Sequence, residues 1–391
     1  MARKKIAAIV TTYFDGSHAN LLVSRFVTGF PTPSGLIESQ VDVVSMYMEQ
    51  LHPQDIGVEF AREHGIELFP SIRSALTLQQ PMRGPWPTAP GWEIGELAVD
   101  GVLIIAEHGD YSPNERGRQL YPRRHFFEQV CGMIGLSGRA IPVFSDKHLA
   151  YSWDDARWMY DRAVELGIPF MAGSSLPVTG RTPWFEHEIG VEIEDALVLG
   201  HFNPYPNGLD SYGFHGLEAL QCMVERRCGG ETGIAAVRCL EGPAVWEAAE
   251  QGLWPRDLAA EAESRITEVE AGRMEDNCVR PALFQLEYVD GFRATTLMLD
   301  RHVRGFAYAA RVNGETVSTG FHTGDTTIKE SFGAQGLAVH EMFLTGKPQY
   351  PVERSLLTTG AHAALMDSRY FGGVRIETPW LDVSYKPPAG P

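Results

Sequence analysis

The fold is decided by residues 6–18, which read Ile6-Ala7-Ala8-Ile9-Val10-Thr11-Thr12-Tyr13-Phe14-Asp15-Gly16-Ser17-His18. Ile6–Val10 is a short, continuous apolar run, as expected for a strand that is buried on both faces. Apolar residues then recur at helical spacing through Ser17–Gly29. A strand that leads directly into a helix is the repeating unit of parallel sheets, so this segment predicts an α/β fold.

The same alternation continues to about residue 175 and predicts a Rossmann-like parallel-sheet domain over residues 1–175. We expect further strands at Val41–Tyr47, Ile66–Phe69, Val102–Ala106, Ile141–Phe144 and Pro169–Ala172. We expect helices at Asp55–His64, Ser71–Leu76, Arg123–Ile134 and Trp153–Leu166. The Pro- and Gly-rich stretch Pro81–Trp92 predicts a surface loop, whose Trp86 and Trp92 could stack on a ring or pin the loop down.

The pattern changes in the second half of the chain, where longer strands are separated by tight turns. Strands are predicted at Phe284–Tyr288, Ala294–Leu299, Arg304–Val312 and Glu315–Phe321, with turns at Asp290-Gly291 and Asn313-Gly314. Helices are predicted at Gly216–Arg226, Ala244–Gln251, Pro255–Ala271, Leu337–Leu344 and Leu356–Ser368. Residues 176–391 are therefore expected to form an α+β domain with a largely antiparallel sheet.

The composition restricts the partners of the protein. The net charge of −17 argues against nucleic acid and against an anionic membrane surface, which both attract basic proteins. No stretch is long and apolar enough to span a membrane. The five cysteines include no C-x-x-C pair and are expected to be reduced thiols. We expect a cytoplasmic protein whose partner is a small molecule.

Several segments, in order, resemble the Gfo/Idh/MocA family of sugar-type oxidoreductases. They are Val41–Gly65, Val99–Ala106, Ile141–Gly173, Ser211–His215 and Thr345–Pro348. Lys147 stands at the family's E-K-P lysine and His215 at the histidine of its D-x-G-x-H segment. The resemblance implies an NAD(P)-dependent dehydrogenase in which Lys147 and His215 assist hydride transfer. It also implies a homo-oligomer that pairs through the second sheet.

The first turn departs from the family's G-x-G-x-x-G pattern, which lets bare backbone approach a pyrophosphate closely. Here the three glycine positions are Thr11, Tyr13 and Gly16, and Asp15 adds a negative charge. The acid expected after the second strand is replaced by Met48. These changes argue against NAD(P). If a cofactor binds at this turn, the residues expected to contact it are Tyr13, Gly16 and His18, the last together with helix N–H groups.

Ligands of parallel sheets bind beyond the C-terminal ends of the strands, and that rule selects candidate residues. We expect one crevice to contain Tyr13, Asp15, His18, Glu107, His108, Asp110, Tyr111, Asp146, Lys147, His148, Ser174 and Ser175. Carboxylates and imidazoles suit Zn, Mn or Fe, and Glu107, His108, Asp146 and His148 are the candidate metal ligands, with His215 nearby. The alternative is structural, with the acids capping helices and His148 hydrogen-bonding a loop.

Lys147, His215 and Glu218 are the candidate catalytic residues. A buried Lys147 could exchange protons, or a carboxylate could hold it charged so that it orients a substrate oxygen. His215 and Glu218 are three residues apart and would share a helix face. Tyr111, His201 and Arg124 are the candidate substrate contacts. The alternatives are a structural ion pair for the lysine, a capping role for the imidazole and solvent-exposed positions for the others.

Three functions remain open at this point. The first is a non-redox enzyme, a lyase, hydrolase or isomerase, which acts on a small polar substrate with metal or acid–base assistance. The second is an NAD(P)-dependent sugar-type dehydrogenase with an atypical phosphate loop. The third is a non-catalytic binding protein. Fold resemblance does not separate them, because function depends on the site.

Overall fold

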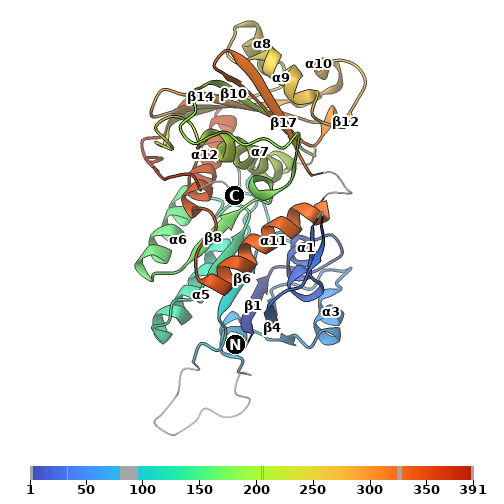
Figure 1. Cartoon of the computed structure of the whole chain (residues 1–391), viewed down its shortest axis with the longest axis vertical. Helices are drawn as coiled ribbons and strands as arrows, with labels where there is room; N and C mark the ends of the chain where they lie inside the picture. Colours follow the sequence, from blue (N-terminus) through green and yellow to red (C-terminus); the bar gives the residue numbers. More distant parts are fainter. Residues whose placement is uncertain are drawn as a thin grey trace.

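The computed structural model describes residues 3–32, 34–79, 96–203, 205, 207–323 and 328–388. The predicted loop Pro81–Trp92, with Trp86 and Trp92, lies outside these residues. Figure 1 shows two lobes, each built around one sheet, with helices α7 (Gly208–Val224) and α12 (Val352–Tyr370) between the sheets. Among the described residues, no helix is long and apolar enough to cross a membrane.

The first sheet is parallel, as predicted, and its six strands have the order β5-β4-β1-β6-β7-β8. Their bounds are β1 (Lys4–Val10), β4 (Val41–Met48), β5 (Glu67–Leu68), β6 (Gly101–Ile105), β7 (Val143–Asp146) and β8 (Phe170–Gly173). The chain runs outward from β1 to β5 and then returns to β6 on the other side of β1. This reversal creates the crevice at the strand ends in which open α/β sheets bind ligands.

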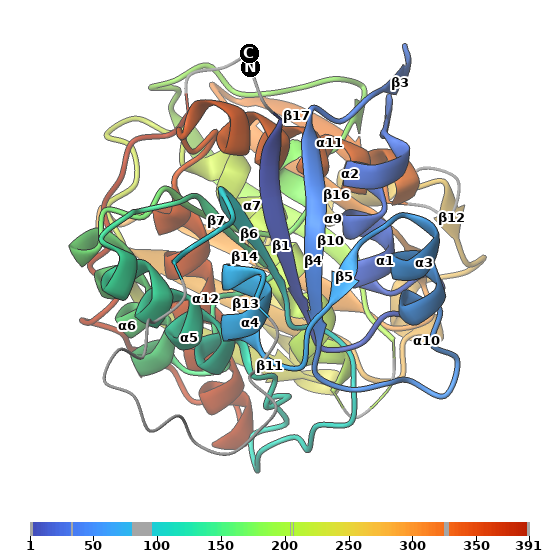
Figure 2. The same ribbon diagram turned by 90° about the horizontal axis from the view of Figure 1, so that it is seen from below.

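Helices cover both faces of this sheet (Figure 2). Along β1, Ile6, Ala8 and Val10 face one layer, whereas Ala7 and Ile9 face the other, as the two-residue period of a strand requires. The first layer contains α1 (His18–Val23), α2 (Arg25–Thr28), α3 (Gly57–Glu63) and α11 (Ile328–Thr345). The second contains α4 (Ile72–Thr77), α5 (Arg123–Ser137) and α6 (Trp153–Glu165). A short hairpin of β2 (Phe30–Thr32) and β3 (Gly35–Ile37) follows α2.

The second sheet has eight strands in the order β18-β11-β13-β14-β10-β16-β17-β9. It is antiparallel apart from the parallel pair β10/β14, so the prediction of a largely antiparallel sheet is confirmed. The predicted strands are β13 (Ala282–Tyr288), β14 (Arg293–Leu299), β16 (Phe306–Val312) and β17 (Glu315–Phe321). The others are β9 (Arg181–Thr182), β10 (Ile193–His201), β11 (Ile234–Glu241) and β18 (Ile376–Glu377), with β12 (Glu268–Val269) and β15 (Val303–Arg304) paired separately.

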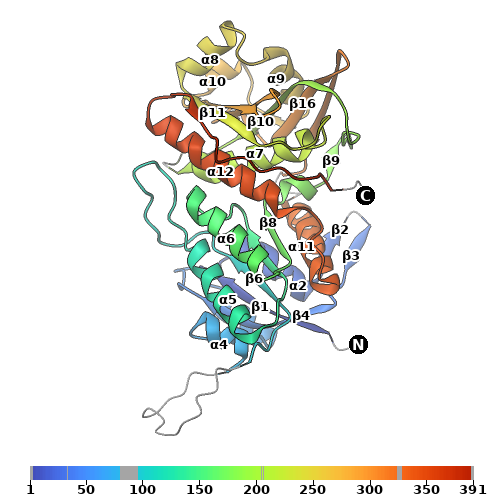
Figure 3. The same cartoon turned by 90° about the vertical axis from the view of Figure 1, so that its left-hand side faces the viewer.

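The outer face of the second sheet carries α8 (Pro243–Glu250), α9 (Arg256–Glu263) and α10 (Met274–Asn277), and the inner face packs on α7 and α12 (Figure 3). Three predicted helices had clearly wrong limits. The helix predicted from Leu337 is α11, which begins at Ile328. The helix predicted from Gly216 begins at Gly208, so His215 lies inside α7 rather than at its start. The helix predicted over Pro255–Ala271 ends at Glu263, and the chain then enters β12. A 3₁₀ turn, Leu176–Val178, follows β8.

Candidate functional site

A cavity of about 480 Å³ lies where the strand ends of the first sheet face α7 and β16 of the second lobe. From the first lobe it is lined by residues that follow β1, β6, β7 and β8, and from the second by α7 and the loop before it. The lining residues that carry polar chemistry are His18, Glu107, His108, Tyr121, Lys147, Ser175, His201, Asn203, Tyr205, Asn207, Ser211, Tyr212, His215, Thr323 and Ser331. The crevice predicted from the strand-end rule therefore contains a real cavity.

Lys147 follows β7 directly and enters the cavity from an unusual backbone. Its φ of 61° lies in the left-handed region, and its N–H donates to the carbonyl of Gly173 at the end of β8 (3.1 Å). Its Nζ donates to Glu107 Oε1 at 2.9 Å, and Arg123 binds the other oxygen of Glu107. Burial by itself raises the pKa of Glu107, but the two adjacent cations outweigh it and hold that pKa well below the usual range. Glu107 is therefore an anion that holds the Lys147 side chain in place.

His18 is the first residue of α1, whose N-cap is the Ser17 hydroxyl. Its Nδ1 lies 2.7 Å from Asp146 Oδ2, the last residue of β7, and the Asp146 side chain is 1% exposed. The ring packs edge-on against Phe332 of α11 and His108. Burial lowers the pKa of His108 to about 4, so that ring is neutral at pH 7. The pairing of His18 with Asp146 joins the loop after β1 to the end of β7 across the crevice.

His215 reaches the cavity from the middle of α7. Its Nδ1 lies 2.6 Å from Ser174 Oγ, and burial, followed by the charge of Lys147, lowers its pKa well below the ordinary value. Glu218 does not line the cavity. It accepts hydrogen bonds from Ser174 N, Ser355 Oγ and Thr358 Oγ1, and burial raises its pKa. Glu218 thus acts on His215 only through Ser174.

The other predicted contacts have different positions. Tyr13 is fully buried in the core, with its ring stacked on Phe60, and Gly16 lies at an open turn with a φ of 77°. Tyr111 packs against Tyr121 below the cavity. Arg124 lies on α5, pairs with Asp155 and stacks over Trp158. Of this set, only His201 joins His18 at the cavity wall.

The predicted metal set is not brought together. Among the described residues, no three His, Cys, Asp or Glu side chains are arranged to hold a metal ion. The reason is charge compensation: Glu107 is taken by Lys147 and Arg123, and Asp146 is taken by His18. His148 points away into the core, where its Nε2 lies 3.3 Å from Arg123 Nη1. The described residues therefore do not group Glu107, His108, Asp146 and His148 as one metal centre, and their role as metal ligands stays a prediction.

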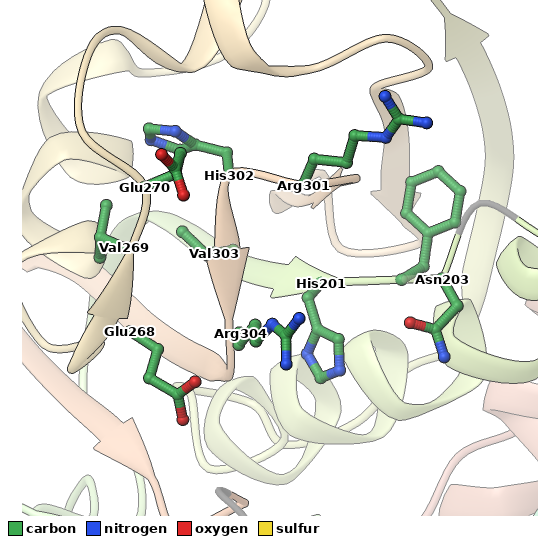
Figure 4. Close-up of a pocket in the computed structure, with 10 residues that line it drawn as sticks. His201, Asn203, Glu268, Val269, Glu270, Arg301, His302, Val303 and Arg304 are labelled. Atoms are coloured by element: carbon green, nitrogen blue, oxygen red, sulfur yellow. The ribbon is translucent and has the colours of Figure 1, made fainter.

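A second groove of about 370 Å³ adjoins the cavity, and the two share His201 and Asn203. Its walls come from β12 and β15, with Glu268, Arg301 and Arg304 around the rim (Figure 4). The Arg304 guanidinium lies beside the His201 ring in this view. Burial and the charge of Arg304 lower the pKa of His201. His201 therefore stands at the passage between the groove and the cavity.

The sequence did not indicate several residues at this site. Arg123 begins a predicted helix and was not among the candidate residues, yet it is fully buried against Glu107. Ser331 and Phe332 come from α11, far along the chain. Glu107 follows the end of β6, and Arg123 begins the next helix, α5. A cation that follows a carboxylate at a strand end was the available signal for Arg123. No local pattern could have placed α11 beside α1.

Neither a model of a known protein family nor a curated protein sequence matches the chain. Solved structures do match over nearly the whole length. GenD2 from gentamicin A biosynthesis, in complex with NAD, is 14% identical, covers 96% of this chain and 97% of its own, and has a TM-score of 0.60. Scyllo-inositol dehydrogenase from Lactobacillus casei, with NAD(H) and scyllo-inositol, is 10% identical, covers 95% and 99%, and has a TM-score of 0.56.

A third match is myo-inositol 2-dehydrogenase from Lactobacillus plantarum, which is 13% identical, covers 96% of this chain and 99% of its own, and has a TM-score of 0.56. The chain has the Gfo/Idh/MocA dehydrogenase fold. The predicted resemblance is thus confirmed at the level of structure. At these sequence identities the comparisons show the fold alone. Whether a dinucleotide fits depends on the residues of this chain.

The turn after β1 does not fit a dinucleotide as such turns do in this dehydrogenase fold. A pyrophosphate is bound there by free backbone N–H groups. In this turn the N–H groups of Phe14 and Gly16 already donate to Ser17 Oγ and Asn20 Oδ1, and that of Ser17 donates to the carbonyl of Phe14. Few donors remain for a phosphate, and Asp15 adds a negative charge.

The loop after β4 packs against the same turn. Gln50 N donates to the Thr11 carbonyl and Ile56 N donates to the Tyr13 carbonyl, while the ring of His52 stacks on Phe14 at 4.2 Å. The long connection between β4 and α3 is thereby bonded across the turn. The part of the crevice above β1 and β4 is occupied by the protein itself, and the open space lies above β6, β7 and β8.

Proposed function

We propose that the protein is an enzyme that uses acid–base chemistry on a small, polyhydroxylated substrate with a hydroxyl or carbonyl group. One observation carries the proposal: Lys147 and His215, from different lobes, line one cavity with a polar wall. A charged ammonium and a neutral imidazole in such a cavity can bind a substrate oxygen and exchange protons with it. The size of the cavity suits a sugar-like ring.

The chain's own residues support this role. Glu107 keeps the Lys147 ammonium directed into the cavity, so that it can stabilise negative charge on a substrate oxygen. Ser174 fixes the His215 ring from behind, through Nδ1, which leaves Nε2 for the substrate. The substrate class is drawn from the solved structures, two of which are inositol dehydrogenases.

The second candidate is an NAD(P)-dependent sugar-type dehydrogenase. The comparisons favour it, because the proteins of known structure include dehydrogenases solved with NAD or NAD(H). The hydrogen bonds within the turn after β1 argue against dinucleotide binding. The two candidates share Lys147 and His215 and differ in whether a dinucleotide is needed.

The experiment is a turnover assay by NMR with myo-inositol, 2-keto-myo-inositol and D-fructose, each with and without NAD. Conversion without NAD supports the proposal, and conversion only with NAD supports the dehydrogenase. Lys147→Ala should remove turnover and keep the fold, as judged by circular dichroism. Lys347→Ala, an exposed lysine after α11, is the matched control and should turn over like the wild type. Wild-type turnover in Lys147→Ala would reject the central role of this lysine.

A further inference from the structure

The cavity carries a second histidine that the proposed function does not use. His18 lines it together with Lys147 and His215 and is held by a buried carboxylate. We propose that His18 Nε2 is the proton acceptor of this enzyme, and that Lys147 and His215 are paired donors to a carbonyl oxygen. The reaction class is then removal of a proton from the carbon beside a carbonyl. This inference rests on the proposed function and specifies its chemistry.

The hydrogen bond to Asp146 decides the form of His18. An ionised carboxylate only accepts hydrogen bonds, so at 2.7 Å the proton of the neutral ring must be on Nδ1. Nε2 then carries a lone pair. His18 is part-buried, with its side chain 14% exposed, so the ring borders the cavity and is still shielded from bulk water. A carboxylate behind the ring is the arrangement that orients a histidine for proton abstraction.

Ser174 decides the form of His215 in the opposite sense. The Oγ of Ser174 accepts a hydrogen bond from the Leu176 N–H at 3.1 Å. Within the described residues, the acceptor for the Ser174 hydroxyl proton is His215 Nδ1, at 2.6 Å. Since Ser174 is buried, a hydroxyl proton without an acceptor would be costly. The hydroxyl therefore donates to Nδ1, and the neutral His215 ring presents Nε2–H to the cavity. Asp146 and Ser174 are positioning residues for the two rings.

The residues that line the cavity then provide one acceptor and two donors. In the proposed step the bond between hydrogen and the carbon beside the carbonyl breaks, and the proton goes to His18 Nε2. The electron pair moves into the carbonyl group and forms an enolate. Its oxygen accepts hydrogen bonds from Lys147 Nζ and His215 Nε2, which stabilise the developing charge. His18 can return the proton to the same carbon, which restores the ketone and leaves only hydrogen exchange. Alternatively, the enolate oxygen takes the proton of the neighbouring hydroxyl group, and return of the proton from His18 to the former carbonyl carbon leaves the carbonyl group on the neighbouring carbon. Neither route needs an oxidant.

The substrate class follows from the same contacts. The step requires an aldehyde or ketone with a hydrogen on the neighbouring carbon. The remaining polar wall, which includes Ser211, Tyr212 and Asn203, provides hydroxyl and amide partners for further hydroxyl groups. A hydroxylated ketone such as 2-keto-myo-inositol meets both requirements and is the probe we would use.

The test combines two measurements. NMR of isotope-labelled histidine reports which ring nitrogen carries the proton, with signals assigned by His18→Gln and His215→Gln. We expect Nδ1–H for His18 and Nε2–H for His215. Exchange of the hydrogen beside the carbonyl of 2-keto-myo-inositol is then followed in heavy water. Asp146→Asn, whose amide can donate to Nδ1 and invert the ring, should slow exchange by about 10³–10⁴-fold, as a tautomer error does in Ser-His-Asp sites.

Ser174→Ala should remove the fixed Nε2–H signal of His215, and His125→Gln, an exposed histidine on α5, is the matched control with wild-type exchange. Nε2–H on His18 or Nδ1–H on His215 would overturn the inference. Unchanged hydrogen exchange in His18→Gln would also overturn the inference. The proposed acid–base function would then remain, with a residue other than His18 as the base. The wild type could bind the ketone without exchanging the hydrogen beside the carbonyl. In that case both the inference and the proposed function fail, even when both tautomers are as expected.

Discussion

Lys147 Nζ lies 2.9 Å from Glu107 Oε1, and the two side chains are 6% and 3% exposed. Arg123, which is fully buried, binds the same carboxylate, so one anion compensates two cations. This arrangement makes Glu107 the central charge of the site. It also explains why a carboxylate that looked like a metal ligand in the sequence is committed to other partners.

Removal of the anion should therefore cost more stability than removal of one cation. Glu107→Gln leaves Lys147 and Arg123 buried without a counter-charge, and we expect a loss of about 3–5 kcal/mol in the free energy of unfolding. Lys147→Met leaves Glu107 paired with Arg123, and the expected loss is smaller, roughly 1.5–3 kcal/mol. Urea unfolding of both variants measures the difference. Equal losses would contradict the shared-anion arrangement.

The same pair predicts a pH dependence of stability. The folded-state pKa of Glu107 is held well below its unfolded value of about 4.3, so the unfolded chain binds the proton more readily. Its contribution is complete above that unfolded pKa and is lost as the pH falls toward the folded pKa. Wild type and Glu107→Gln should thus converge in unfolding free energy as the pH is lowered below about 4. Parallel pH profiles for the two proteins would show that Glu107 is not the group responsible.

Gly173, at the end of β8, should not tolerate a side chain. Its φ is 127°, and an added Cβ would collide with Glu218 Oε2 and lie 2.7 Å from Ser355 Oγ. Gly167 also has a positive φ, of 62°, but an added Cβ there has no neighbour within 4 Å. We expect Gly173→Ala to cost about 1–3 kcal/mol more than Gly167→Ala and to displace the adjacent Ser174. Thermal unfolding of the two variants, together with the His215 NMR signal, checks both effects.

The turn after β1 predicts poor dinucleotide binding. Because the N–H groups of Phe14, Gly16 and Ser17 already have acceptors, a titration followed by NADH fluorescence should show no saturation below about 1 mM. Asp15→Asn removes the negative charge and leaves these hydrogen bonds, and it should not restore binding. Saturable binding by the wild type would revive the dehydrogenase. Binding gained only in Asp15→Asn would show that charge, rather than the occupied donors, is the obstacle.

The strands of the first sheet could be predicted because each is a short apolar run followed by a helical pattern. Four strands of the second sheet were found from their turns. β10 and β11 were not, although β10 lies at the centre of its sheet. The sequence predicts the start of α7 at Gly216, whereas the helix begins at Gly208, about two turns earlier. A helix that is buried almost all round has a weak periodic pattern, which explains that error.

The amino-acid sequence by itself determined the parallel sheet and, through the strand-end rule, part of the cavity lining, namely His18, Glu107, His108, Lys147 and Ser175, because local apolar periodicity fixes where strands stop. The tertiary structure alone decided how those residues pair. Glu107 binds Lys147 and Arg123 rather than a metal, Asp146 binds His18 from 128 positions away, and Ser174 binds His215 from 41 positions away. Such pairings follow from the compensation of buried charges and polar groups between elements that meet only in the folded protein, and no local pattern encodes them.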